Sequence, residues 1–361
     1  MNSKNTEIPV GLIGFGMAGR VFHAPTIFAV PGLRLAAILQ RSRGDEAALY
    51  PNARVVTTLE ELLAIDEIRL VVIATSNPSH FDLARQCLLA GRDVVVDKPF
   101  TTTYQEAVEL VRIARERGRL LTVFQNARWH GDFRTVKKLI DAGTLGRLVF
   151  YEAHFDRFRP RLRPGAWRER DEPGSGVFFD LGPHLIDQAM ALFGTPEALT
   201  ATIRIERDNA VIDDAFYVVL HYKSLRVELR ATMLAGEAPG LAFALHGTLG
   251  SYVKYGRDVQ EEALRRGEVP HDDTWGREPE EKWGALYTEK DGKAVVQPVP
   301  TEAGDYRRYY ENVRDAILRR ASLDVSAEHA LNVMRALELA RESSRKRCSL
   351  VWQSGEIATS F

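Results

Sequence analysis

The sequence of 361 residues has little of several features that would restrict its function or location. Its two cysteines, Cys87 and Cys348, are too few for a disulfide framework or a thiolate metal site. The nine histidines are scattered without a metal-ligand spacing backed by acids, so we expect no metal. No apolar run approaches membrane-spanning length and the first residues carry no apolar signal core, so we expect a reducing, cytoplasmic location.

The chain also lacks an excess of either charge, with 48 basic and 49 acidic residues and a formal net charge of -1. A global field that would attract nucleic acid or an anionic membrane is missing, and we expect neither as a partner. Hydrophobic residues make up 45% and charged residues 27%, which is ordinary for a globular protein. The length favours two domains over one.

Short apolar runs alternate with helical patterns through the first third of the chain. Residues 81–91 have helical spacing and end in glycine, and residues 103–118 open with a candidate capping box of Thr103 and Glu106. Apolar strands that alternate with helices predict a parallel sheet covered on both faces. The apolar runs are residues 8–14, 33–39, 69–74, 93–96 and 120–124.

The first turn of this pattern has three glycines in G-x-G-x-x-G spacing, directly after a strand and before a helix start. Such glycines let the turn close and bring the backbone near a pyrophosphate, whose charge is stabilised at the helix N-terminus. An ordinary glycine turn is the alternative. We expect cofactor contacts from Gly14, Gly16, Met17 and Gly19.

The end of the second predicted strand favours NADP(H) over NAD(H). An NAD site expects an acid about 20 residues beyond the glycines. This place holds Arg41, Ser42 and Arg43, with no acid before Asp45. Arginine and serine can donate hydrogen bonds to a ribose 2′-phosphate, which a carboxylate would repel. The alternative is that the arginines are solvated loop charges and that NAD is also used.

Polar residues follow the third and fourth apolar runs, at the sheet edge where such folds bind ligands. Thr75, Asn77 and His80 are candidate cofactor contacts, although Asn77 could instead cap the following helix. His80 reads as a helix residue near the cofactor rather than as a catalytic base. Asp97 and Lys98 precede a proline that fixes the backbone, and burying a lysine is costly. Lys98 is therefore either a solvated loop residue or an ammonium group held for chemistry.

Beyond Phe124 the pattern changes to alternating strands with few helices between them. This arrangement predicts largely antiparallel pairing and an α/β protein with two different sheets. The alternating segments are residues 147–158, 198–205, 215–222 and 225–233.

Two motifs, in order along the chain, give it a family resemblance. An acid followed by Lys-Pro ends the fourth strand at Lys98, and a glycine pair precedes D-x-x-x-H at Asp180 and His184. With the glycine turn, these motifs resemble the Gfo/Idh/MocA family (glucose–fructose oxidoreductase / inositol dehydrogenase). The segments QNARWHGDF, HFDRFRP and GSYVKYG are most similar to the subgroup that contains NADP-dependent scyllo-inositol dehydrogenase.

The resemblance implies an N-terminal Rossmann domain at residues 1–124 and a C-terminal α/β domain at residues 125–361. The second domain would have a large open, mostly antiparallel sheet, bind the substrate and mediate oligomerisation. Because an open sheet exposes a broad face, we expect a homodimer or homotetramer. The closing helix, at about residues 326–345, is expected to pack back on the Rossmann domain.

Asp180, His184 and Asp187 are spaced four and three residues apart, which puts them on one helix face, although Pro183 leaves the helix start open. Oxidation of an alcohol needs a base for the hydroxyl proton and a cation for the developing alkoxide. The resemblance assigns these roles to His184 and Lys98, converging on one carbinol beside the nicotinamide. Asp180 would hold the imidazole or bind a substrate hydroxyl, and Asp187 reads as structural, bonded to a backbone group or an arginine.

Other residues are expected near the same chemistry. The family geometry would bring Asn126 to the nicotinamide side of the cofactor. Residues 157–170 hold six arginines and one acid, too short a stripe for nucleic acid. This segment is either a loop that favours an anionic or heavily hydroxylated ligand or a solvated surface loop. Candidate substrate or cofactor contacts, with packing as the alternative role, are Arg128, Trp129, Trp167 and Arg168.

The sequence thus predicts an NADP-dependent oxidoreductase that transfers a hydride between the nicotinamide and a secondary alcohol or ketone of a cyclic polyol or sugar. One alternative is a nicotinamide-dependent glycoside-cleaving enzyme of the same family, which would turn over without net change in nicotinamide absorbance. Another is a non-catalytic nucleotide sensor, which would need the glycine turn but not Lys98, Asp180 and His184.

Overall fold

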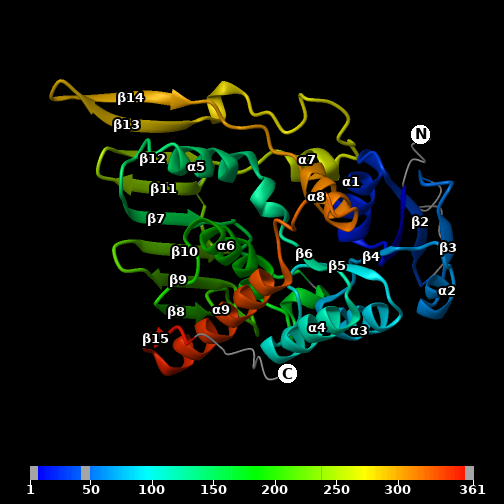
Figure 1. The fold of residues 1–361 in the computed structure, drawn as a ribbon. Helices are drawn as coiled ribbons and strands as arrows, with labels where there is room; N and C mark the ends of the chain where they lie inside the picture. Colours follow the sequence, from blue (N-terminus) through cyan, green and yellow to red (C-terminus); the bar gives the residue numbers. More distant parts are fainter. Residues whose placement is uncertain (1–6, 42–48, 164, 237, 354–361) are drawn as a thin grey trace. The chain divides into compact units, whose positions relative to one another are not determined.

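The computed structural model describes residues 7–41, 49–163, 165–236 and 238–353 (Figure 1). By their internal contacts the residues form two compact units. Two later segments group with the first 126 residues, which the predicted boundary at residue 124 did not include. Unit 1 comprises Met1–Asn126, Gln260–Trp275 and Asp305–Leu331, and unit 2 comprises Ala127–Val259, Gly276–Gly304 and Asn332–Phe361.

Unit 1 is built on a parallel six-stranded sheet with the order β3-β2-β1-β4-β5-β6. The order reverses between β1 and β4, as in doubly wound dinucleotide-binding folds, so the predicted Rossmann arrangement is confirmed. The five predicted apolar runs form five of these strands. The apolar pattern missed β3, an edge strand of three residues. The strands are β1 (Ile8–Ile13), β2 (Leu33–Leu39), β3 (Arg54–Val56), β4 (Leu70–Ile73), β5 (Asp93–Asp97) and β6 (Leu121–Phe124).

Two helices of unit 1, α3 and α4, lie within a residue or two of the segments that the sequence predicts. At the start of α4, Thr103 Oγ1 accepts a hydrogen bond from the Glu106 N–H at 3.2 Å, and Glu106 Oε2 accepts one from the Thr103 N–H at 3.0 Å. This reciprocal pair is the predicted capping box, and Gly118 closes the helix in a left-handed conformation. The helices are a π turn (Gly19–His23) continuing into α1 (Ala24–Ala29), α2 (Leu59–Leu63), α3 (His80–Leu89), α4 (Tyr104–Arg117), α7 (Gln260–Arg265) and α8 (Arg307–Ile317).

The core of unit 1 lies in the central strands of this sheet. All four residues of β4 and the valines of β5 are completely buried, which explains why these strands are apolar on both faces. The late helix α8 packs on α1, so a segment some 280 residues away in sequence completes the cover of the first helix. This packing brings the aromatic residues of α8 to the core of unit 1.

Unit 2 is built on a nine-stranded sheet with the order β14-β13-β12-β11-β7-β10-β9-β8-β15. Only the β7–β10 pair is parallel among these neighbours, which confirms the prediction of a mostly antiparallel sheet. The strands are β7 (Leu148–His154), β8 (Ala198–Arg204), β9 (Ala215–His221), β10 (Arg226–Thr232), β11 (Leu241–Gly247), β12 (Gly250–Tyr255), β13 (Gly284–Lys290), β14 (Lys293–Val299) and β15 (Leu350–Val351).

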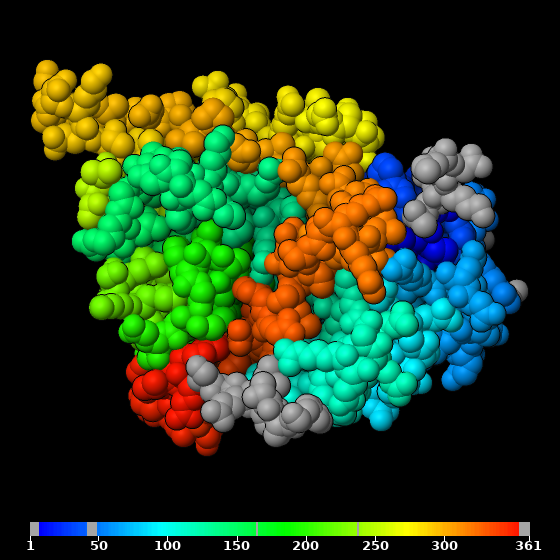
Figure 2. All heavy atoms as spheres, viewed as in Figure 1, coloured from blue at the N-terminus to red at the C-terminus, as the bar shows by residue number. Residues whose placement is uncertain are grey.

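Helices α5 (Gly131–Asp141), α6 (Val177–Phe193) and α9 (Ala327–Lys346) complete the elements of unit 2, and the division between the units falls within α9. Helix α6 packs on β9 and β10 and runs without interruption through Pro183. Its start, which the sequence left open, is Val177, whose N–H donates to the Asp213 carbonyl. The β13–β14 hairpin extends beyond the neighbouring strands of this unit (Figure 2).

Within the residues that the structure describes, no helix combines the length and the apolar composition needed to cross a bilayer.

Candidate functional site

The glycine turn of unit 1 lies between β1 and the Gly19–His23 π turn. A side chain at Gly14 would come within 2.7 Å of the Ala74 carbonyl oxygen, and one at Gly19 within 2.0 Å of the Gly14 carbonyl oxygen. These two glycines are therefore needed to close the turn. A Cβ at Gly16 would meet no atom of the described residues within 4 Å, so the backbone there is open to a close approach. This combination fits a pyrophosphate-binding turn.

The carboxyl ends of β4 and β5 are joined by a buried histidine. His80, the first residue of α3, is completely buried, and its Nδ1 lies 2.9 Å from the Pro99 carbonyl and its Nε2 3.3 Å from the Thr75 carbonyl. Burial lowers the pKa of His80 despite the opposing charge of Asp97. His80 thus links the turn after β4 with the turn after β5, and Asn77 lies buried in the short helix before α3.

Lys98 directly follows the last residue of strand β5 at this same edge of the sheet. Its backbone N–H donates to Asp97 Oδ1 at 2.8 Å, and the Lys98–Pro99 peptide bond is cis. Apart from Lys4, Lys98 is the only lysine in the sequence of unit 1, where the other permanently cationic side chains are arginines. At this position the chain therefore has a compact ammonium group, whose hydrogen-bond geometry differs from that of the planar guanidinium of an arginine.

Behind Asp97 lies a pair of buried side chains that the sequence did not single out. His23 Nε2 is 3.7 Å from Asp97 Oδ1, and His23 Nδ1 is 2.6 Å from the Tyr310 hydroxyl. Both His23 and Tyr310 are completely buried, and the His23 ring packs on Phe124 of β6 at 4.3 Å between centroids. Sequence spacing offers no signal for this contact, because Tyr310 is 287 residues from His23.

Two further candidate cofactor contacts flank this edge. Arg41 follows β2 and is exposed, and Asn126 follows β6 at the start of a short helix, Asn126–Trp129. Ser42 and Arg43 lie outside the described residues. Because strand β1 lies between β2 and β4, the glycine turn and the Thr75 and Asp97 turns belong to neighbouring strands of one sheet edge.

In unit 2, helix α6 carries Asp180 and His184 of the second motif and also Asp187. Asp187 is completely buried and binds Arg128 through two hydrogen bonds, from Nε at 2.7 Å and from Nη2 at 2.8 Å. Of the two partners expected for Asp187, a backbone group or an arginine, the arginine is present. The neighbouring Gln188 donates to the Ala127 carbonyl at 2.7 Å, so this end of α6 is fixed to the segment that carries Arg128 and Trp129.

Removing the charge of Asp187 should be costly. We expect Asp187→Asn to lower the free energy of unfolding by about 3–5 kcal/mol, because it leaves a buried guanidinium without its carboxylate. Urea unfolding followed by circular dichroism measures this change. Asp141→Asn, which breaks the exposed Lys137–Asp141 pair of α5, is the control and should cost under about 1 kcal/mol. Equal effects of the two substitutions would contradict the assignment.

One turn before Asp187, His184 is nearly buried, and its ring lies 5.6 Å from that of Phe155. The guanidinium of Arg257 covers the Phe155 ring at 3.3 Å. Asp180, one turn earlier still, is half-buried and lies between two arginines, with Arg157 Nη1 at 3.7 Å and Arg168 Nε at 3.5 Å. The helix face therefore presents an imidazole and a carboxylate that is held by cations.

The arginine-rich segment, residues 157–170, contacts Asp180 through some of its residues and the rest of unit 2 through others. Arg157 and Arg168 face Asp180, and Arg168 also lies over the ring of Trp167 at 4.8 Å. Glu169 accepts from the Arg163 N–H at 2.7 Å and pairs with the buried Arg207, which ties the segment to the rest of unit 2. The sequence identified Arg168 and Trp167 as candidate contacts but did not single out Arg157, Phe155 or Arg257.

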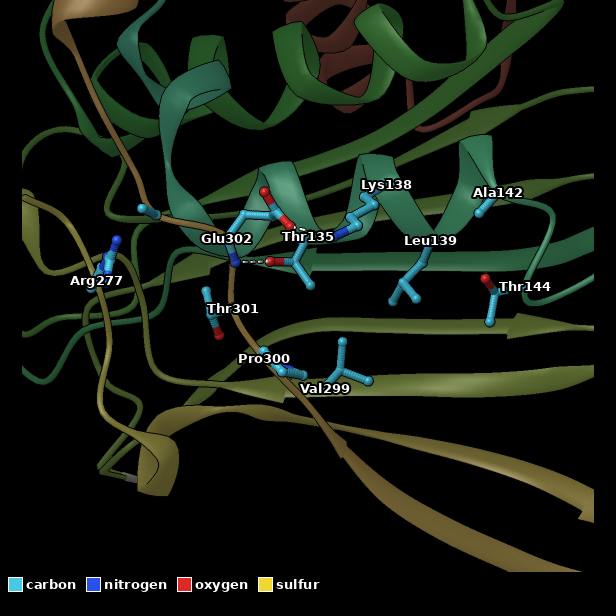
Figure 3. A pocket seen from close by; sticks show the side chains of 11 residues that line it. Thr135, Lys138, Leu139, Ala142, Thr144, Arg277, Val299, Pro300, Thr301 and Glu302 are labelled. Carbon is cyan, nitrogen blue, oxygen red and sulfur yellow. Dashed lines mark hydrogen bonds and ion pairs between the residues drawn. The ribbon is translucent and has the colours of Figure 1, made fainter. Parts of the chain in front are cut away.

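A separate hollow of about 430 Å³ lies between α5 and the segment that follows β14 (Figure 3). Thr135, Lys138 and Leu139 line it from the helix, and Val299 to Ala303 line it from the other side. Lys138 pairs with Glu302 at its rim at 2.6 Å. None of the candidate site residues lines this hollow.

Comparison with known proteins assigns both halves of the chain. A family model described as the NAD-binding Rossmann fold of the Gfo/Idh/MocA oxidoreductase family matches residues 8–125, and one described as its C-terminal alpha/beta domain matches residues 137–350. The chain is 43% identical to the uncharacterized oxidoreductase YdgJ of Escherichia coli, covering 95% of this chain and 98% of the relative. It is 37% identical to the scyllo-inositol 2-dehydrogenase (NADP(+)) IolW of Bacillus subtilis, covering 96% and 97%.

Solved structures agree with this assignment. The yvaA oxidoreductase structure from Bacillus subtilis superposes with a TM-score of 0.94 at 37% identity, covering 98% of this chain and all of the other. The YPO2259 oxidoreductase structure from Yersinia pestis has a TM-score of 0.92 at 40% identity, covering 98% and 99%.

Proposed function

Because the chain belongs to the Gfo/Idh/MocA family of oxidoreductases, with an NAD(P)-binding Rossmann domain, we propose that it oxidises and reduces a cyclic polyol or sugar with NADP(H). The observation that carries the proposal is the position of Lys98, a lysine directly after the carboxyl end of β5, on the sheet edge that also holds the glycine turn. The name of the Bacillus subtilis relative, an NADP-dependent inositol dehydrogenase, supports the substrate class and the cofactor.

The bound nicotinamide would supply the hydride acceptor for oxidation and the hydride donor for reduction. The Lys98 ammonium donates a hydrogen bond to the substrate oxygen and stabilises the negative charge that develops on it. His184 accepts the hydroxyl proton during oxidation and returns it during reduction, so that the carbinol and the ketone differ by one hydride and one proton. Asp180, held by Arg157 and Arg168, binds a neighbouring substrate hydroxyl.

Several residues would hold the cofactor. Gly14, Gly16, Met17 and Gly19 would bind the pyrophosphate through the backbone of the turn, and Thr75, Asn77 and Asn126 would line the path toward the nicotinamide. Arg128 with Trp129, and Trp167 with Arg168, would face the substrate. We propose a homodimer or homotetramer in which the broad sheet of unit 2 is the self-association surface.

The experiment that tests the function is spectrophotometric. The purified protein is assayed with NADP⁺ and with NAD⁺ against inositols, aldoses and sugar acids, and in reverse against the corresponding ketones. We expect nicotinamide absorbance to change with at least one inositol or inosose. Cleavage of a glycoside without net change in absorbance would instead favour the glycoside-cleaving enzyme, and cofactor binding without any turnover would favour a sensor.

Discrimination between the two cofactors is expected to depend on the end of β2. Arg41→Ala should raise KM for NADP⁺ by roughly tenfold and leave KM for NAD⁺ nearly unchanged, because one charge-assisted hydrogen bond to the 2′-phosphate is lost. Steady-state kinetics with both cofactors measures the ratio. Arg34→Ala is the matched control, since Arg34 lies on β2, the strand before Arg41, but pairs with Glu7 and Glu67. An unchanged ratio in Arg41→Ala would remove this residue from the 2′-phosphate site.

A further inference from the structure

Lys98 lies next to a chain of three polar groups that leads into the core of unit 1. The Tyr310 hydroxyl contacts His23 Nδ1 at 2.6 Å, His23 Nε2 faces Asp97 Oδ1 at 3.7 Å, and Asp97 Oδ1 accepts the Lys98 N–H at 2.8 Å. The first two groups are completely buried, and Asp97 retains only 15% of its side-chain exposure. Helix α8, the Gly19–His23 π turn and the end of β5 supply these residues, so the arrangement is not a consequence of local sequence.

We propose that His23 and Tyr310 are positioning residues for Lys98, acting through Asp97. The inference rests on the proposed role of Lys98 as the cation that binds the substrate oxygen. The buried pair orients the Asp97 carboxylate, and the carboxylate accepts the Lys98 N–H and interacts electrostatically with the lysine charge.

The protonation state of Tyr310 determines the direction of its hydrogen bond with His23. Burial, together with the nearby Tyr309 and Asp97, raises the pKa of Tyr310 well above its ordinary value, so its hydroxyl stays protonated and donates to His23 Nδ1. The remaining imidazole proton is then on Nε2, the nitrogen that faces Asp97. With its proton on Nε2, the imidazole of His23 favours the ionised form of the Asp97 carboxylate that it faces.

The electrostatics of Asp97 agree with this protonation of His23. Burial alone would raise the pKa of Asp97, but the interactions with His23, Lys98 and His80 outweigh it and the pKa falls below its ordinary value. In the folded protein the ionised carboxylate therefore stabilises the structure above its ordinary pKa, and this contribution is lost as the pH falls through the lowered value. Loss of His23 should raise the pKa of Asp97 again, because the carboxylate would lose the imidazole nitrogen that faces it.

The test compares Tyr310→Phe and His23→Leu with Tyr309→Phe. Tyr309 is the matched control, because it is equally buried and packs on Phe124 at 4.9 Å, but its hydroxyl bonds Thr122 at 3.3 Å instead of His23. For Tyr310→Phe and His23→Leu we expect kcat to fall roughly tenfold to a hundredfold with KM for the cofactor unchanged. At acid pH we also expect an additional loss of kcat in these two variants, as Asp97 becomes protonated and its charge is lost, whereas Tyr309→Phe should keep the wild-type profile.

A second measurement does not need turnover. The destabilisation caused by His23→Leu should be largest at neutral pH and shrink as the pH falls and Asp97 becomes protonated in the variant. Combining it with Asp97→Asn in a double-mutant cycle of urea unfolding should show a coupling that is absent between Tyr309 and Asp97.

The turnover and unfolding measurements distinguish a failure of the proposed function from a failure of the positioning role. A wild-type protein without turnover would remove the proposed function, while the unfolding cycle would still report on the link between His23 and Asp97. A pH-independent destabilisation by His23→Leu, or identical pH profiles for Tyr310→Phe and Tyr309→Phe, would overturn the positioning role. Should His23→Leu fail to fold, Tyr310→Phe, which removes a single oxygen atom, carries the same comparison.

Discussion

Replacement of Lys98 by alanine should reduce kcat by roughly 10²- to 10³-fold while the Kd for NADP(H) stays nearly unchanged. The ammonium group is required only when negative charge develops on the substrate oxygen, so its loss should affect the transition state more than cofactor binding. Stopped-flow turnover and a fluorescence titration of NADPH measure the two quantities.

The controls for Lys98→Ala address charge and fold separately. Lys98→Arg keeps the positive charge but replaces a compact donor by a planar fork, and we expect it to recover only part of the lost activity. Lys137→Ala removes an exposed lysine of α5 that pairs with Asp141, and it should leave kcat unchanged. A fully active Lys98→Ala protein would remove the catalytic assignment of this lysine.

Replacement of His184 by alanine should lower kcat for alcohol oxidation by roughly 10²- to 10⁴-fold, the usual contribution of a positioned acid/base. In the wild type, oxidation needs the neutral imidazole, so kcat should rise with pH through the range in which histidine titrates. His184→Ala should lose that limb, and reduction of the ketone should lose the opposite limb. A pH series of kcat in both directions measures these changes.

The double variant Lys98→Ala/His184→Ala provides the internal control for both assignments. Two groups that act on one oxygen and its proton work as a unit, so the double variant should be little worse than the poorer single variant. Losses that multiply would indicate that the two residues act at separate places. Unchanged activity in His184→Ala alone would assign the proton transfer to another group.

Much of the fold could be predicted because it depends on local rules. Apolar runs of the right length became the strands of the parallel sheet, since strands covered on both faces must be apolar throughout. Thr103 and Glu106 formed the predicted capping box, because both partners lie within one helical turn. The short edge strand β3 escaped prediction, because only its last residue is buried and it leaves no apolar run.

The candidate site likewise contains contacts that the sequence could predict and contacts that it could not. Asp187 read as structural, bonded to a backbone group or an arginine, and the structure supplies Arg128, because a buried carboxylate needs a cation or several donors. By contrast, Arg157 was one of six arginines in a short segment, and spacing alone could not indicate that it faces Asp180. The contact depends on how β7 leads into that segment beside α6.

By itself the sequence determined the family, the two sheets and the order of the motifs, because periodicity, glycine spacing and capping act over a few residues. Only the tertiary structure decided that Tyr310, from a late helix, lies against His23 behind the Asp97 carboxylate. It also decided that two of the six arginines hold Asp180. Such contacts join residues tens to hundreds of positions apart, and burial determines which of the many polar side chains meet.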